Sequence, residues 1–203
     1  MGINRRLMAG TPSISDNLEI AIKSPSGDVI DTILPIELKR SDWGAVYERC
    51  VGLHYEFLGY SVDYHGARLG YNDGGVDLIA KCDGETRFIQ CKFKLSSAIS
   101  RSQIEWILYN ASSLLHKQAV ASRQIFDLVV PSIQIAFPTK RASRSGRVKP
   151  NLAMLAFLAR NQSQSRVHLA ITEIPMPVAN PAVDPVRFAL WTLRYKAAQR
   201  RSP

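Results

Sequence analysis

The chain has 203 residues, of which 46% are hydrophobic and 21% are charged, as expected of one globular domain or of a core with an appendage. It contains no apolar run long enough to span a membrane, and its first residues lack the continuous apolar stretch of a signal peptide. Its three cysteines show no metal-ligand spacing, so we expect reduced thiols in a cytoplasmic protein without a membrane partner.

The net charge of +9 is unevenly distributed along the chain. Residues 1–138 carry 14 basic and 15 acidic side chains, whereas residues 139–203 carry 12 and 2. The densest basic stretch lies among serine and glycine and contains Lys140, Arg141, Arg144, Arg147 and Lys149. Because cations that meet phosphates release condensed counterions, this composition predicts a flexible basic loop that binds nucleic acid.

The first 40 residues are predicted to form a loose tail, residues 1–16, followed by a β-hairpin over residues 17–36. A helix is expected from Ser41 or Asp42, because apolar residues then recur at helical spacing until Gly59. Gly59 is the type of residue that ends helices in the left-handed conformation.

Residues 74–93 read as two short strands joined by a tight turn at Asp83-Gly84. Side chains alternate along a strand, so Gln90 and Lys92 share one face, and the turn brings Asp77 back across from them. An acid on one strand, with an acceptor and a lysine on the next, suits metal-assisted phosphodiester cleavage. Asp73 is expected to shape the glycine turn that precedes Asp77.

The rest of the chain predicts further alternation of helices and strands. A helix is expected over residues 101–119, and a strand pair, or one strand bent at Pro131, over residues 126–137. The last third predicts an apolar helix at 151–160, a strand at 166–174 and a basic amphipathic helix at 186–201. We therefore expect a core at residues 41–138 and a basic C-terminal extension at 139–203 that packs on the core or completes it.

Four motifs along residues 43–118 resemble the catalytic core of Mrr-type restriction endonucleases, a branch of the PD-(D/E)xK nuclease superfamily. They are Tyr47-Glu48, Leu58-Gly59-Tyr60-Ser61-Val62, Asp73-Gly74-Gly75-Val76-Asp77-Leu78-Ile79-Ala80 and Gln90-Cys91-Lys92. The resemblance covers under half of the chain, and the order and spacing of the motifs are fairly specific. It implies an α/β fold, a restriction-endonuclease-like mixed β-sheet flanked by helices, here with an N-terminal hairpin and a basic C-terminal extension.

The resemblance also implies a site and a reaction. The active-site residues carried across are Glu48, Asp77, Gln90 and Lys92, with Mg²⁺ held by Asp77, Gln90, the Cys91 backbone carbonyl and Glu48. The expected activity is Mg²⁺-dependent hydrolysis of DNA phosphodiesters of the restriction or defence type, with Mn²⁺ as a substitute metal. Lys94 is expected to join the nucleic-acid-binding surface, and the chain is expected to act as a homodimer.

Two other functions remain open from the residues. A Holliday-junction resolvase uses a closely similar core and would also be small and basic. Alternatively, the chain is a non-catalytic DNA-binding subunit of a larger defence or mobile-element complex, in which a partner subunit supplies specificity. The complete set Glu48, Asp77, Gln90 and Lys92 favours an enzyme.

Overall fold

The structure is a computed structural model that describes residues 2–15, 17–39, 41–70, 73–95, 97–117, 123–141, 148–149, 151–159 and 167–176. The chain divides into two compact units, Met1–Phe57 with Pro175–Pro203, and Leu58–Ile174. This division differs from the boundaries expected at residues 40 and 138. Within the described residues, no helix combines the length and hydropathy needed to cross a membrane.

The first unit contains a three-stranded antiparallel sheet in the order β1-β2-β3. Its elements are α1 (Ile3–Leu7), β1 (Thr11–Ile14), β2 (Ile20–Lys23), β3 (Val29–Ile33), the 3₁₀ helix η1 (Pro35–Glu37) and α2 (Asp42–Phe57). The pairing of β2 with β3 confirms the predicted hairpin. The prediction of a loose tail is wrong, because Leu7 is buried and Arg6 forms ion pairs with Asp31 and Glu37.

Helix α2 follows the sequence prediction closely. The Asp42 carboxylate accepts a hydrogen bond from the Lys39 backbone N–H at 2.7 Å, and Gly59 has φ +87° just after the helix. The side chains at helical spacing are buried in the structure, namely Trp43, Val46, Tyr47, Cys50 and Val51. The helix is therefore held by one apolar face rather than by intrinsic propensity alone.

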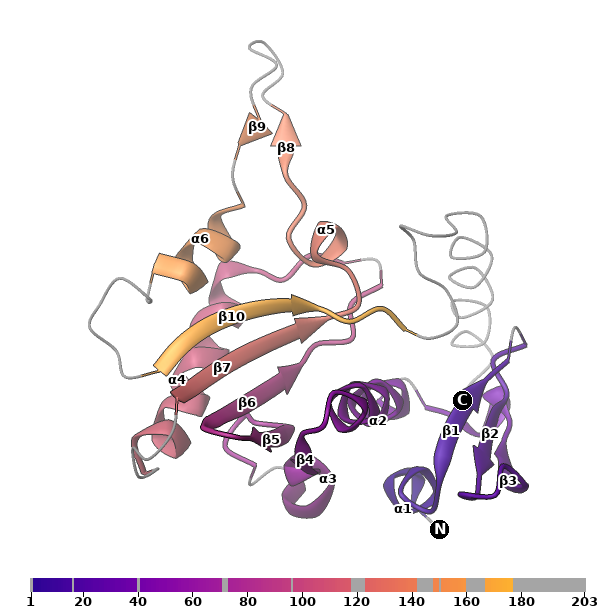
Figure 1. Cartoon of the computed structure of the whole chain (residues 1–203). Helices are drawn as coiled ribbons and strands as arrows, with labels where there is room; N and C mark the ends of the chain where they lie inside the picture. Colours follow the sequence, from indigo (N-terminus) through magenta and orange to yellow (C-terminus); the bar gives the residue numbers. More distant parts are fainter. Residues whose placement is uncertain are drawn as a thin grey trace. The chain divides into compact units, whose positions relative to one another are not determined.

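The second unit is built on a five-stranded mixed sheet in the order β10-β7-β6-β5-β4 (Figure 1). Strands β6, β7 and β10 are parallel, whereas β4 and β5 are antiparallel to their neighbours. Its elements are β4 (Ser61–Asp63), α3 (His65–Leu69), β5 (Leu78–Cys82), β6 (Glu85–Cys91), α4 (Arg101–Lys117), β7 (Arg123–Val130), α5 (Ile133–Ala136), β8 (Lys140–Arg141), β9 (Val148–Lys149), α6 (Leu152–Leu158) and β10 (Val167–Glu173). The expectation of a mixed α/β fold is confirmed, and β6 is the central strand.

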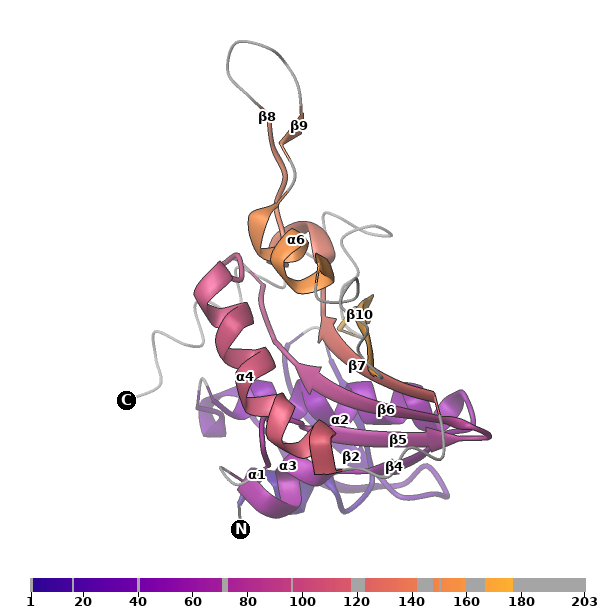
Figure 2. The same cartoon turned by 90° about the vertical axis from the view of Figure 1, so that its left-hand side faces the viewer.

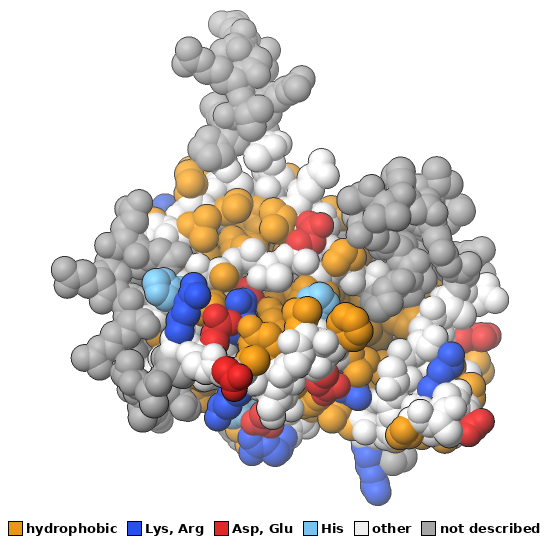
Figure 3. Space-filling view, in the orientation of Figure 1, with side chains coloured by type: hydrophobic (Ala, Val, Ile, Leu, Met, Phe, Trp, Pro, Cys, Tyr) orange, Lys and Arg blue, Asp and Glu red, His pale blue; other side chains and the backbone are white. Residues whose placement is uncertain are grey.

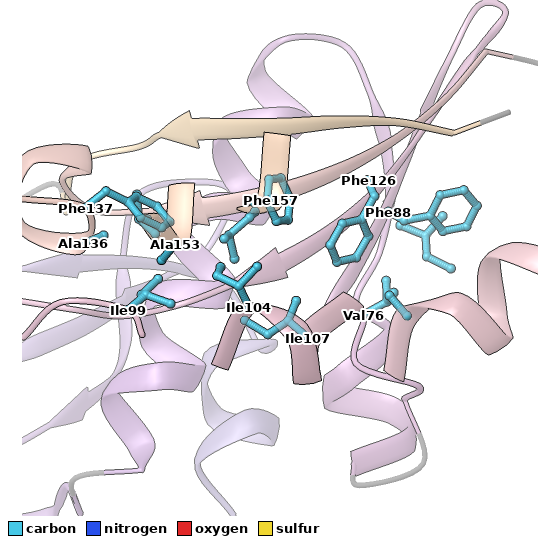
Figure 4. Packing of buried hydrophobic residues seen from close by; sticks show 14 residues of the cluster. Val76, Phe88, Ile99, Ile104, Ile107, Phe126, Ala136, Phe137, Ala153 and Phe157 are labelled. Carbon is cyan, nitrogen blue, oxygen red and sulfur yellow. The ribbon is translucent and has the colours of Figure 1, made fainter. Parts of the chain in front are cut away.

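The core of the second unit lies between this sheet and the helices α4 and α6 (Figure 2). Ile104 and Ile107 of α4 point toward the sheet, where Phe126 and the α6 residue Phe157 pack (Figure 4). Each of these side chains is at most 2% exposed, and full burial of such a side chain contributes about 1.5–3 kcal/mol. Phe88 belongs to the same cluster, so alternation along β6 places Gln90 on the α4 side of the sheet.

The opposite face of the sheet carries a buried ionic link. Asp127 of β7 is fully buried, and its Oδ2 accepts hydrogen bonds from Arg87 Nη1 at 3.0 Å and from Thr172 Oγ1 at 2.9 Å. Removing one partner would leave the buried Asp127 charge uncompensated, so residues of β6 and β10 are both needed to satisfy it. It lies on the other side of the sheet from Gln90.

Two segments differ from the sequence predictions. Residues 133–136 form the helical turn α5 rather than a strand. The Ile133 backbone N–H at its start donates a hydrogen bond to the carboxylate of Glu173, 40 residues away in sequence, at 2.6 Å. The base of the expected flexible basic loop is a two-stranded hairpin, in which Lys140 pairs with Lys149 and Arg141 with Val148. The helix predicted over residues 186–201 lies outside the described residues.

Candidate active site

The β5–β6 hairpin positions the candidate site as the sequence predicted. Cys82 pairs with Glu85 across the Asp83-Gly84 turn, and Gly84 has φ +72°. At the other end of the hairpin, the Asp77 backbone N–H donates to the Ile89 carbonyl oxygen at 2.8 Å. This bond fixes Asp77 beside Gln90 where β5 begins.

The Asp77 carboxylate is buried and held through a single oxygen. Only 7% of Asp77 is exposed, and its Oδ2 accepts hydrogen bonds from the Cys91 backbone N–H, at 2.6 Å, and from Gln90 Nε2. No described residue donates a hydrogen bond to the other oxygen, Oδ1. The side chain is therefore oriented firmly while one of its oxygens keeps its capacity to bind a ligand.

Three charged groups interact at this point. The pKa of Asp77 is raised to about 6, mainly by burial, and the negative charge of Asp73 acts in the same direction. The positive charge of Lys92 and the hydrogen bonds from Cys91 and Gln90 lower the pKa, which offsets part of the burial effect. Asp73 and Lys92 are therefore both within electrostatic reach of a carboxylate that is mostly ionised at neutral pH.

The turn before Asp77 is shaped by Asp73, and Gly66 of α3 lies against it. Gly75 has φ +75°, and its backbone N–H donates to Asp73 Oδ1 at 2.7 Å, which supports the predicted turn-shaping role of Asp73. A Cβ placed on Gly66 would lie 3.2 Å from Asp77 Cα and 3.5 Å from Asp73 Oδ2. Both Asp73 Oδ2 and Asp77 thus lie beside Gly66, which keeps Asp73 as the weaker candidate for the site that the sequence also indicated.

Helix α4 packs against the same turn at Gly75. A Cβ on Gly75 would lie 3.0 Å from Asn110 Cβ and 3.5 Å from Gln90 Oε1. Asn110 is therefore a site neighbour that sequence analysis missed. Asn110 lies near the site only through its packing against Gly75, which is 35 residues away in the chain, and no local sequence pattern indicates such a contact.

The remaining predicted site residues are less fully placed. Lys92 is half-buried, and its backbone N–H bonds to the Val129 carbonyl at 2.9 Å, while Lys94 lies half-buried two residues further on. Glu48 lies half-buried on α2 in the first unit, and the two units are not placed relative to one another. The contribution of Glu48 to the site therefore remains a prediction.

The predicted phosphate-binding residues lie mainly where side chains are not described. Lys140, Arg141 and Lys149 are seen only as backbone in β8 and β9, and Arg144 and Arg147 lie outside the described residues. On the described surface of the face in Figure 3, basic and acidic side chains are intermixed. The basic excess thus belongs to the last third of the sequence and not to this face of the described chain.

The oxygen donors at the site fit a hard divalent cation. The described residues include no cluster of three or more His, Cys, Asp or Glu suited to a metal ion. Mg²⁺ nevertheless keeps several waters and needs only one or two carboxylates from a protein. Asp77 Oδ1 and Gln90 Oε1 accept no hydrogen bond from a described residue, so each can serve as a ligand. The Cys91 backbone carbonyl and Glu48 are the other two ligands that the sequence predicts.

Comparisons of the chain with protein-family profiles, with curated proteins and with solved structures gave no match.

We predict that Asp77→Asn stabilises the protein at neutral pH. Because the pKa of Asp77 in the folded chain exceeds its ordinary value of 3.8, stability falls as pH rises from about 4 to about 6. Asparagine stays neutral and its oxygen can accept both hydrogen bonds that reach Oδ2. Urea unfolding at pH 7 should show a gain of up to about 3 kcal/mol, vanishing below about pH 4. A variant that is less stable at pH 7 would contradict this assignment of the carboxylate.

A second prediction compares two glycines with positive φ. Gly84→Ala meets open space, so it should lower the free energy of unfolding by about 1–2 kcal/mol through backbone strain alone. Gly75→Ala carries the same strain and also crowds Asn110, which should add about 1–3 kcal/mol. Denaturant unfolding of both variants measures the difference. Equal losses would show that α4 does not pack tightly on this turn.

Proposed function

We propose that this protein is a divalent-metal-dependent DNA endonuclease with a restriction-endonuclease-like core. The observation that carries the proposal is the Asp77 carboxylate, which is buried, held through one oxygen and neighboured by Lys92. A buried carboxylate with a raised pKa and a specific charge partner is typical of functional sites. The resemblance to Mrr-type nucleases assigns the same residues to phosphodiester hydrolysis.

Asp77, Gln90 and Lys92 would have different roles in the reaction. Asp77 Oδ1 and Gln90 Oε1 would hold Mg²⁺, which supplies Lewis-acid polarisation of the phosphoryl oxygen and lowers the pKa of water. Gln90 and the Cys91 N–H keep Asp77 oriented for this task. Lys92 would offset the negative charge that grows on the phosphoryl group and orient the attacking water.

DNA is the substrate that the charge distribution favours. The 12 basic and 2 acidic residues of positions 139–203 suit a polyanion that extends well beyond the cleaved bond. The backbone register of the hairpin stem places Lys140 opposite Lys149, so two of these basic residues lie at one level of the hairpin.

A cleavage assay tests the function directly. The purified protein is incubated with Mg²⁺ or Mn²⁺ and with plasmid, methylated plasmid, single-stranded DNA, RNA and a four-way junction. We expect cleavage of DNA that stops in EDTA and is abolished by Asp77→Asn. Lys92→Ala should slow single-turnover cleavage by about 10²–10³-fold, because one charge stabiliser is lost, with little change in DNA affinity. Lys81→Ala, an exposed lysine near the β5–β6 turn, is the matched control and should leave the rate unchanged.

The same panel separates the alternatives. Preference for the four-way junction would identify a resolvase-like enzyme, and DNA binding without cleavage of any substrate would identify a binding subunit. Activity that persists in EDTA or in Asp77→Asn would end the metal-nuclease proposal. A Lys92→Ala protein that cuts normally but binds weakly would assign Lys92 to the binding surface only.

A further inference from the structure

Helix α4 exposes two large aromatic side chains to solvent. Trp106 is 63% exposed and Tyr109 is 77% exposed, although the same helix buries Ile104 and Ile107 completely or nearly so. The two aromatics are three residues apart, so they lie side by side on one face of the helix. Neither side chain is used by the core of the second unit.

This aromatic face continues into the candidate active site. Asn110 follows Trp106 by four residues, so the two side chains lie on the same stripe of α4, one turn apart. Asn110 Cβ lies at the Gly75 turn, where Gln90 Oε1 is also found. A polymer that reaches Asp77 over Asn110 would next meet Trp106 and Tyr109.

The charges beside the aromatics are compatible with a nucleic acid. The acid next to Trp106, Glu105, is paired with Arg101 at 2.9 Å, so its repulsion of phosphate is offset. The Arg101 side chain is itself 69% exposed. Exposed aromatic rings bind single strands mainly by base stacking, which does not require a cation at the same point.

A second copy of the chain fits this face poorly. Two aromatic side chains of 150–250 Å² each, partly exposed, offer roughly 300 Å², whereas a stable interface needs about 800 Å² from each partner. The neighbouring residues Gln103 and Asn110 are polar, so they add no apolar area to this face. Duplex bases are stacked on one another and cannot lie on the rings, so unpaired bases are the fitting occupant.

We propose that Trp106 and Tyr109 form a stacking platform for unpaired bases of the DNA strand that enters the candidate active site. This inference rests on the proposed nuclease function and narrows its substrate to DNA with a single-stranded segment. An exposed ring offers a face on which an unpaired base can stack.

The test measures binding without cleavage, in EDTA and in the Asp77→Asn full-length protein. Fluorescence anisotropy compares a labelled oligo-dT strand with a blunt duplex of the same length. Trp106→Ala and Tyr109→Ala should each weaken single-strand binding by about 5–150-fold, the loss of one stacked base, and change duplex binding less than twofold. Trp106→Phe should retain most of the affinity. Leu152→Ala, a 70% exposed side chain on α6, is the control for loss of exposed apolar surface and should have no effect.

Tryptophan emission gives a second readout that does not depend on the alanine variants folding well. In a Trp191→Phe background the remaining tryptophans are Trp43, which is fully buried, and Trp106. Oligo-dT should quench the emission, and Trp106→Phe should remove that quenching. Unchanged single-strand affinity, equal losses on single strand and duplex, or a change in self-association alone would each overturn the platform. The platform and the nuclease can fail separately. A wild-type protein that cuts no substrate in the cleavage assay, but whose Trp106 still quenches on oligo-dT, would refute the nuclease alone.

Discussion

The burial of the Asp77 carboxylate is the constraint on which the candidate site depends. Both hydrogen bonds reach the same oxygen, one from the Cys91 backbone and one from Gln90, so the hairpin itself sets the orientation of the carboxylate. Burial raises the pKa to about 6, and Lys92 opposes that rise. The fold therefore gives up stability at neutral pH to keep a charged oxygen oriented, an exchange typical of functional sites.

Strand β6, helix α4 and the glycine turn surround the Asp77 carboxylate. β6 lies at the centre of the sheet and carries Gln90 toward α4, and the glycine turn lets α4 approach until Asn110 lies near Gln90. The partly buried Arg87–Asp127 pair on the other face joins β6 to β7, which pair in parallel register. In this arrangement the proposed chemistry is on one side of the sheet and the structural ion pair on the other.

Sequence patterns predicted the helices and strands that depend only on residues close together in the chain. Alternation and the Asp83-Gly84 turn sufficed to bring Asp77 opposite Gln90, and helical spacing sufficed for α2 and α4. Features that depend on distant partners were missed. The N-terminal residues are ordered through Arg6 with Asp31 and Glu37, and α5 depends on Glu173. Asn110 reaches the site only because α4 packs on Gly75.

The most direct test of the account is a titration with Mn²⁺ in the absence of nucleic acid. Calorimetry at pH 7.5 should show saturable Mn²⁺ binding that is lost in Asp77→Asn, because the asparagine keeps both hydrogen bonds but presents an amide N–H₂ where Oδ1 lay. Binding should also weaken as the pH falls through about 6, where Asp77 takes up a proton. Equal Mn²⁺ affinity in the wild-type and Asp77→Asn proteins, with no change across this pH range, would contradict the claim that this carboxylate is a metal ligand.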